Sequence, residues 1–382
     1  MRVMGLVAVA CAAALSTASP ASAGLESDPD LDAAADLDAA LAALVAADDG
    51  PIGASAIVQR GDRISFHRAG VADLRTGRAI HRTDHMRIAS TAKAFSGAVA
   101  LSLVDRGLIG LDDTIGELLA GQPAAWSEVT VAQLMQHTSG VPDFTESQAF
   151  RDRFGSDPRG YFAPEELPAF VADRPLNFEP GTEYRYSNTD NILIGLIAQA
   201  ETGRLYSNDL RQLVYRPLGL MQTSLPNDWL MPRRYIHGYD VPDGGEPPED
   251  ISELASASGA WASGGLVSTP ADLNRFIRGY VGGALFGGEA RARQFAFVEG
   301  NSDPPGPGEN SAGLSLFRYR TRCGTVFGHT GNIFGYTQFM AATRNGRRSA
   351  VVSVSHQYTG STLEGIRLAD ERAVCLALSR GG

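Results

Sequence analysis

The sequence predicts an α/β (α+β) protein: an antiparallel sheet, flanked by helices and completed by both chain ends, with a largely helical domain inserted. Strand-like segments occur near both ends of the chain, whereas its middle carries helical patches separated by loops rich in Pro, Gly and Asp. The 382 residues are 43% hydrophobic and 20% charged, which is enough to bury one large core or two smaller ones. Strands at both ends favour one sheet that the two termini complete.

The first part of the expected sheet domain, residues 24–112, contains two expected helices and two expected strands. Its acidic, alanine-rich start carries apolar residues at helical spacing, which predicts a helix packed on the domain. These apolar residues are Leu37, Leu41, Leu44 and Val45. Two strands joined by a turn are expected next, and then a long helix that a glycine ends. The segments are 54–59, 63–69 and 90–104, with Gly107 after the last.

The remaining chain divides into an expected helical domain, residues 113–253, and the second part of the sheet domain, residues 254–382. Helical patches of the inserted domain are expected at 131–136, 165–172 and 192–202. The second part of the sheet domain should contain two helices and four strands. The helices are expected at 270–280 and 363–378, and the strands at 314–319, 325–328, 336–343 and 350–355.

The first 23 residues have the pattern of a signal peptide. Arg2 precedes the short apolar stretch 3–15, and residues 21–23, Ala-Ser-Ala, fit a small-residue cleavage site. The apolar stretch is too short for a membrane span, and no later segment is apolar enough to cross a bilayer. We therefore expect a secreted protein that is cleaved near Ala23.

Charge and cysteine usage exclude several kinds of partner. The net charge is −10 and no basic run occurs, which argues against a nucleic-acid ligand. The scattered histidines and the lack of C-x-x-C or H-E-x-x-H indicate no metal, and no cofactor is expected. Signal removal would leave two cysteines, Cys323 and Cys375, an even pair in an oxidising compartment. A disulfide between them is expected, and two buried free thiols are the alternative.

One lysine stands among 32 arginines. Lys93 follows Ser90 by three residues, so the two side chains share a helix face. A guanidinium is never deprotonated in proteins, whereas an ammonium can be, and a helix N-terminus beside Ser90 would favour the neutral amine. An S-x-x-K pattern alone is weak, because chance supplies it about once in a chain of this length. A capping serine beside a solvated lysine is the simpler alternative.

Two further motifs carry suitable groups. Tyr186 and Asn188 precede an apolar helix, and a phenol near two cationic groups can accept or relay a proton, while the asparagine can hold both the lysine and a substrate amide. Residues 329–331, His-Thr-Gly, follow a strand-like run and offer a polar cationic group and an edge for a substrate backbone. Each motif alone is equally well explained as a turn.

Together, in this order, the three motifs resemble those of the penicillin-recognising serine hydrolases, which include class C β-lactamases, D-alanyl-D-alanine carboxypeptidases and related esterases. Residues 136–140 and 181–188 extend the resemblance over nearly all of the mature chain. It implies a β-lactamase/transpeptidase-like fold and an acyl-enzyme on Ser90. The residues that it assigns to the site are Ser90, Lys93 and Tyr186 for catalysis, Asn188, His329, Thr330 and Gly331 for substrate, and the N–H groups of Ser90 and Asn332 for the oxyanion.

Within the family, secreted actinobacterial D-alanyl-D-alanine carboxypeptidases are most similar. They also carry a histidine in the third motif, matching His329, and a cysteine pair like that of this chain. Trp261 matches a tryptophan that lines the family's cleft, although a buried core tryptophan is the alternative. This chain differs from those enzymes at one position. They have an arginine there that holds the substrate's terminal carboxylate, and this chain has Phe317. Arg318 or Arg320 could take the place of that arginine only if the strand shifted locally, because neighbouring residues alternate between its faces. Asn332 replaces a hydroxyl residue.

Four functions follow as hypotheses. The first is a D-alanyl-D-alanine carboxypeptidase that acts on peptidoglycan-type peptides and is acylated by penicillins. A class C-like β-lactamase and an esterase or D-aminopeptidase are the enzymatic alternatives, and an inactive binding protein is the fourth. The expected partners are small peptides, β-lactams or esters, without nucleic acid or a membrane span, and the protein is expected to be a monomer. No G-x-S-x-G occurs, which excludes a nucleophile-elbow hydrolase.

Overall fold

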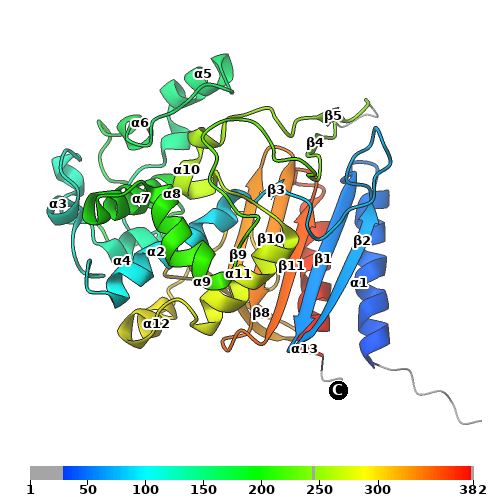
Figure 1. Cartoon of the computed structure of the whole chain (residues 1–382). Coiled ribbons are helices and arrows are strands. Elements are labelled where there is room, and N and C mark those ends of the chain that lie inside the picture. The colour runs from blue at the N-terminus through cyan, green and yellow to red at the C-terminus, as the bar shows by residue number, and fades with distance from the viewer. Residues whose placement is uncertain (1–28, 243–245, 380–382) are drawn as a thin grey trace, which may run out of the picture.

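One antiparallel sheet between two layers of helices forms the frame of the protein (Figure 1). The computed structural model describes residues 29–242 and 246–379, so the expected signal peptide lies outside the described residues. Seven strands follow the order β2-β1-β11-β10-β9-β8-β7, with every neighbouring pair antiparallel. Strand β1, from the start of the chain, pairs with β11, from its end. The predicted completion of the sheet by both chain ends is confirmed.

The described elements are arranged in the chain as follows. The strands are β1 Gly53–Arg60, β2 Arg63–Gly70, β3 Met86–Arg87, β4 Tyr239–Asp240, β5 Glu249–Asp250, β6 Val267–Ser268, β7 Glu309–Gly313, β8 Leu316–Thr321, β9 Gly324–Ile333, β10 Tyr336–Ala342 and β11 Arg348–Val354. The helices are α1 Pro29–Ala46, α2 Ala92–Asp105, α3 Ile115–Leu118, α4 Val131–Gln136, α5 Gln148–Ser156, α6 Glu166–Ala169, α7 Asn188–Thr202, α8 Tyr206–Asp209, α9 Arg216–Leu218, α10 Trp261–Gly264, α11 Pro270–Gly282, α12 Gly288–Gln294 and α13 Leu363–Leu378. Within the described ranges, no helix is both long and apolar enough to cross a membrane.

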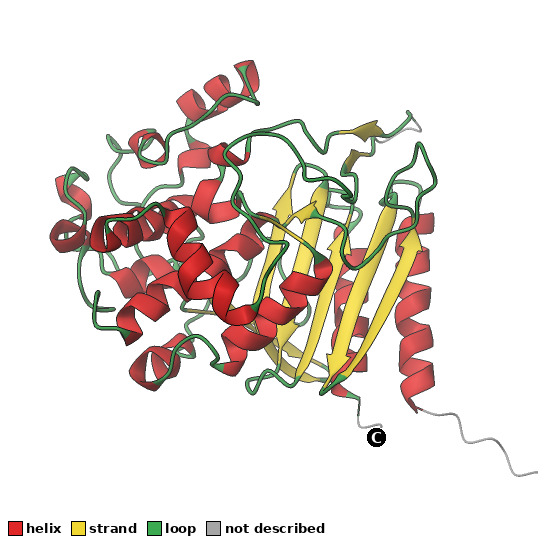
Figure 2. Ribbon diagram, in the orientation of Figure 1, coloured by secondary structure: helices red, strands yellow, loops and turns green. Residues whose placement is uncertain are grey.

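The two faces of the sheet are covered by different helices (Figure 2). Because side chains alternate along a strand, Ala56 and Val58 of β1 contact the layer of α1 and α13, whereas Ile57 belongs to the core on the other face. The predicted apolar stripe of α1 is buried against the first face, where Leu37 and Leu41 are fully covered. The second face packs against α11 and α2, while α7 and α10 pack against α2 in turn, and the three sequence motifs lie on this side.

The expected elements occur in the structure, and several of them have different bounds. Helix α13 has the predicted bounds, and α3 to α9 all fall within residues 113–253, together with the short strands β4 and β5. The division at residues 112/113 and 253/254 stays a prediction. Strand β9 runs five residues beyond the expected end at Gly328, so the His-Thr-Gly motif lies inside a strand. The edge strand β7 and helix α5 were not expected from the sequence.

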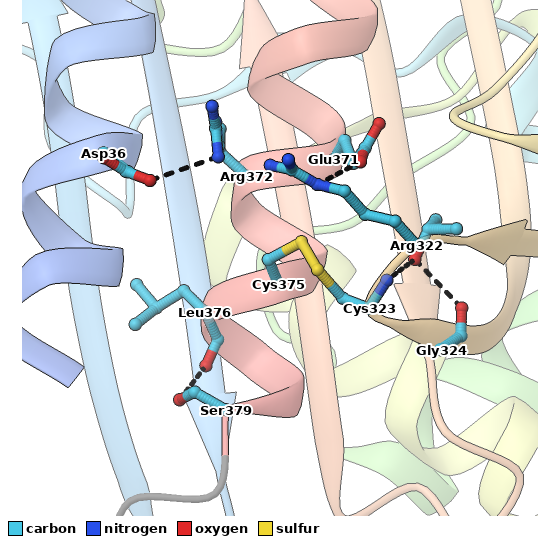
Figure 3. The surroundings of a disulfide bond; sticks show 10 residues. Asp36, Arg322, Cys323, Gly324, Glu371, Arg372, Cys375, Leu376 and Ser379 are labelled. Carbon is cyan, nitrogen blue, oxygen red and sulfur yellow. Dashed lines mark hydrogen bonds and ion pairs between the residues drawn. A yellow bond between two sulfur atoms is a disulfide. The ribbon is translucent and has the colours of Figure 1, made fainter. Parts of the chain in front are cut away.

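A disulfide joins the sheet to the helix layer of α1 and α13 (Figure 3). Cys323, in the turn between β8 and β9, is bonded to Cys375 of α13, 52 residues away. Two ion pairs lie beside it: Arg322 to Glu371, 2.7 Å apart, and Arg372 to Asp36 of α1, 3.1 Å apart. The covalent bond therefore anchors one end of the β8–β9 hairpin, whose second strand carries the third motif.

Replacing both cysteines by serine should lower the free energy of unfolding by about 4 kcal/mol, because the bond restricts a long loop of the unfolded chain. Urea unfolding of the double variant and the wild type measures this loss. A reducing agent should destabilise the wild type to the same extent and leave the double variant unchanged. Equal stability of the oxidised wild type and the variant would contradict the assignment.

Candidate active site

The expected nucleophile, Ser90, lies in a short 3-10 turn, Ala89–Thr91, that leads directly into α2. Helix α2 begins at Ala92, two residues later than expected. Ala89 has a φ of 49°, a left-handed conformation that is costly for a residue with a Cβ atom. The turn leaves Ser90 partly exposed in the wall of a cavity of about 340 Å³. The hydroxyl is therefore open to a small substrate.

Lys93 is fully buried, and its Nζ contacts three oxygen atoms. Nζ lies 2.7 Å from Asn188 Oδ1, 2.8 Å from the main-chain oxygen of Ser263 and 3.1 Å from Ser90 Oγ. A neutral amine has two N–H donors and one lone pair. Since the two carbonyl oxygens can only accept, they take the two N–H groups, and the lone pair is left for the proton of the Ser90 hydroxyl. The contacts thus match the needs of an unprotonated amine that serves as a base.

Burial lowers the pKa of Lys93 from 10.5 to about 7, because the ammonium loses its hydration inside the protein. The carboxylates of Asp143, Asp303 and Asp190 act in the opposite direction and limit this decrease. A base with a pKa near the working pH is present in its neutral form and still binds the transferred proton well. An arginine at this position would stay charged.

Asn188 is held in place by a carboxylate that the sequence analysis did not identify. Asp143 Oδ2 accepts one hydrogen bond from the main-chain N–H of Asn188 at 2.9 Å and another from its side-chain Nδ2 at 2.8 Å. This pair of bonds leaves Asn188 Oδ1 facing Lys93. Asp143 lies in a loop between the first two motifs, where no residue pattern distinguishes it from an ordinary turn aspartate.

Tyr186 lies beside the lysine, with its ring centroid 4.8 Å from Lys93 Nζ. Burial raises the pKa of its phenol well above 10, and the closeness of Ser90 offsets only part of this effect. The buried hydroxyl has no full hydrogen bond among the described residues. The phenol therefore keeps its proton in the free protein, and it suits a proton relay better than an initial base.

A buried polar network of His137, Ser139 and Asp190 packs against Tyr186. The ring of His137 lies 4.5 Å from that of Tyr186, and its Nδ1 is 2.8 Å from Asp190 Oδ2. Ser139 donates to the other oxygen of the same carboxyl at 2.6 Å. Burial lowers the pKa of His137 well below its ordinary value and raises that of Asp190. The segment 136–140, which had no expected role, thus packs against Tyr186 and holds the Asp190 carboxyl.

The third motif differs from expectation in its charge. His329 is fully buried, and burial, with Lys93 adding to it, lowers the pKa of its imidazole to about 3. The expectation of a cationic group is therefore wrong, because His329 is neutral at pH 7. Its Nδ1 lies 2.6 Å from the Thr330 carbonyl oxygen. The Thr330 hydroxyl donates to the main-chain oxygen of Pro304 at 2.6 Å. Neither side chain offers a positive charge to a carboxylate.

Strand β9 passes directly beside the nucleophile. A Cβ atom on Gly331 would lie 2.8 Å from the main-chain nitrogen of Ser90, so only glycine fits there. Strand β8 pairs with β9 only as far as Gly328, and among the described strands the following residues pair with β10 alone. Asn332, one residue further, lines the cavity. A free strand edge thus borders the Ser90 cavity, as a substrate backbone would require.

Trp261 lies away from this cavity. Its ring is 8% exposed and packs 5.0 Å from the ring of Tyr206, and a Cβ on Gly195 would approach it to 2.6 Å. Of the described residues in α10, Ser263 and Gly264 line the Ser90 cavity, and Trp261 does not. Trp261 is therefore a buried core tryptophan, which was the alternative expectation, and it does not line the Ser90 cavity.

The rest of the cavity wall is largely apolar, and helix α5 supplies much of it. The described residues that line the cavity are Ala89, Ser90, Phe144, Thr145, Phe150, Arg151, Phe154, Asn188, Gly259, Ala260, Ser263, Gly264, Asn332, Ile333 and Phe334. Phe154 of α5 and Phe334 of the β9–β10 turn stack with ring centroids 5.7 Å apart. Aromatic rings from two distant segments therefore meet at the cavity.

Comparison with known proteins decides the family. A family model described as Beta-lactamase matches residues 37–373, which is most of the chain. The chain belongs to the beta-lactamase family. This membership confirms the resemblance to penicillin-recognising serine hydrolases, and it makes the protein a serine hydrolase of that family.

Relatives of this beta-lactamase-family protein carry several names. Penicillin-binding protein 4* of Bacillus subtilis (strain 168) is 26% identical over 230 residues, which are 56% of this chain and 49% of the relative, so the chain spans about half of that protein. The solved D-stereospecific amidohydrolase from Streptomyces sp. is 29% identical, with a TM-score of 0.77 over 87% of this chain and 97% of that one. The D-amino acid amidase from Ochrobactrum anthropi SV3 is 25% identical, with a TM-score of 0.80 over 90% and 98%.

Replacing Asp143 by asparagine should change both the rate and its pH dependence. In the wild type, kcat/KM should rise with pH through about 7, as Lys93 loses its proton. The variant lacks a negative charge that raises the pKa of Lys93, so its acid limb should move to lower pH. Loss of the Asn188 clamp should also reduce kcat/KM, by up to about 10²-fold.

The pH profile of p-nitrophenyl ester hydrolysis measures both effects. Glu201→Gln, an exposed acid at the far end of α7, serves as the control and should behave as wild type. An unchanged or upward-shifted acid limb in the Asp143 variant would contradict the assigned electrostatics.

Proposed function

We propose that the protein hydrolyses small amides or esters of D-amino acid type through an acyl-enzyme on Ser90. The observation that carries this proposal is the fully buried Lys93 amine, whose Nζ lies 3.1 Å from Ser90 Oγ and within hydrogen-bond distance of two carbonyl oxygens. The solved structures of similar fold and nearly equal extent, described as a D-stereospecific amidohydrolase and a D-amino acid amidase, support this substrate class.

The proposed reaction has two steps. Ser90 Oγ attacks the substrate carbonyl as its proton passes to Lys93, while the N–H groups of Ser90 and Asn332 stabilise the oxyanion; such a donor is typically worth about 3–4 kcal/mol of the barrier. Tyr186 then gives its proton to the leaving amine or alcohol and is reprotonated from Lys93. The C–N or C–O bond breaks, and an ester to Ser90 remains. Water, deprotonated through the same groups, attacks this ester and releases the acid.

The shape and polarity of the site favour an amide or ester with an apolar group over a D-alanyl-D-alanine peptide. The cavity beside Ser90 is walled by aromatic rings, which suit a larger apolar group than a methyl. Phe317 is buried in the core, at 2% exposed, and Arg318 lies over the ring of Phe297 with its Nε bonded to Ser311 Oγ. Arg318 is not among the described residues that line the Ser90 cavity, so it does not supply there the arginine expected of a carboxypeptidase.

The D-alanyl-D-alanine carboxypeptidase that the sequence first favoured is the second candidate. The bond between Cys323 and Cys375, with His329 in the third motif, matches the carboxypeptidases that the sequence resembles. A disulfide also suits an oxidising compartment, so we propose that the protein is exported by its predicted signal peptide. Secretion and a monomeric state remain parts of this proposal.

Intact mass spectrometry after incubation with penicillin, D-phenylalanine amide and a D-Ala-D-Ala peptide separates the candidates. We expect a mass adduct that Ser90→Ala abolishes and the exposed-serine control Ser207→Ala retains, together with release of ammonia from the amide. Release of D-alanine alone would favour the carboxypeptidase, and rapid turnover of the penicillin adduct the β-lactamase. Labelling that survives Ser90→Ala, or no adduct with any probe, would overturn the proposal.

A further inference from the structure

One charged residue is among the described residues that line the Ser90 cavity. Arg151 lies on α5 between Phe150 and Phe154, and all three line the cavity. Residues four apart on a helix share a face, so the two rings point the same way and the arginine adjoins them. Helix α5 therefore presents both an aromatic surface and a positive charge to the space beside the nucleophile.

The charge of Arg151 is not balanced by an acid. Its two terminal nitrogens donate to neutral oxygens, the main-chain oxygen of Thr145 at 3.2 Å and Gln148 Oε1 at 3.1 Å. No Asp or Glu is among the described residues that line the cavity, and no described acid forms an ion pair with Arg151. Two neighbouring arginines differ: Arg153 pairs with Glu166, and Arg185 pairs with Glu146.

Arg151 is the one charged residue among the described residues that line the cavity, so a ligand there meets a positive charge and no acid. A guanidinium carries five N–H donors, and the two hydrogen bonds of Arg151 leave the others for a ligand. Its exposed position on a helix avoids the cost of a fully buried charge. A carboxylate is the group that a planar guanidinium binds best, through paired N–H···O bonds.

We propose that Arg151 binds a carboxylate of the substrate, so that the preferred substrates are amides or esters that combine an apolar group with a negative charge apart from the scissile bond. The aromatic rings of α5 hold the apolar part, and the guanidinium fixes the charged end. The proposed carboxylate site lies on helix α5, whereas the arginine of the carboxypeptidases corresponds to Phe317 on β8. The inference rests on the proposed acyl-enzyme function and deepens it by naming the substrate class.

Three p-nitrophenyl esters with acyl chains of equal length test the proposal. They are the hexanoate, which is neutral, the hydrogen adipate, which ends in a carboxylate, and the 6-aminohexanoate, which ends in an ammonium. The measured quantity is the ratio of kcat/KM values between esters, because a general loss of folding or catalysis cancels in the ratio. Arg153→Gln, two residues away on the same helix, is the matched control.

The wild type should prefer the adipate ester over the hexanoate, and Arg151→Gln should lower this ratio about fivefold, as expected for one partly exposed charge pair. Arg151→Glu should reverse the preference toward the 6-aminohexanoate ester, an outcome that a merely structural residue would not give. Arg153→Gln should leave all ratios unchanged. The same ratio in Arg151→Gln and wild type would overturn the proposal.

A binding measurement separates this proposal from the acyl-enzyme function. On Ser90→Ala protein, calorimetry with adipic acid monoamide and with hexanamide compares the two ligands without turnover. Stronger binding of the monoamide that Arg151→Gln removes would support the carboxylate site even if no ester were hydrolysed. Equal binding of both ligands would reject the site even if Ser90 were confirmed as the nucleophile.

Discussion

The burial of one amine between three oxygen atoms is the constraint on which the site depends. An ammonium inside a protein is costly, and Lys93 is fully covered, so its neutral form is favoured there. That form requires two acceptors and one donor, which Asn188, the main chain at Ser263 and Ser90 supply. These residues come from α7, α10 and the turn before α2. Their convergence joins α7 and α10 to the start of α2, and Asp143 fixes the asparagine whose orientation completes the set.

The sheet provides the other half of the site. Because β9 passes against the main chain at Ser90, Gly331 brings a strand edge directly beside the proposed nucleophile. Both chain ends stabilise that strand: β11 and β1 extend the sheet on one side of it, and the Cys323–Cys375 bond anchors its start to α13. The rigid strand and the rigid amine thus face each other across Ser90. Phe150, Arg151 and Phe154 of α5 form part of the wall of the same cavity.

Local pattern predicted the frame of the molecule, because the apolar periods of α1, α13 and the inner strands are the faces that the core buries. The order of the three motifs likewise predicted which side chains would meet. Asp143, the Ser263 carbonyl and Arg151 could not be found this way, since their roles arise from contacts between segments far apart in the chain. The predicted charge of His329 was wrong for a related reason. Its imidazole is completely buried, which keeps it neutral, and burial cannot be inferred from the motif alone. Trp261 was ambiguous in sequence, and packing against Tyr206 places it in the core.

The most direct test is the pKa of Lys93 itself. Since the chain contains one lysine, growth with ¹³C-labelled lysine gives a single side-chain Cε resonance by NMR. The account predicts that this resonance titrates with a midpoint near pH 7 in the folded protein and near 10.5 after unfolding in urea. The amine would then be neutral above pH 7 and able to take the Ser90 proton. A midpoint at or above about 10 in the folded protein, as for an ordinary lysine, would contradict the account.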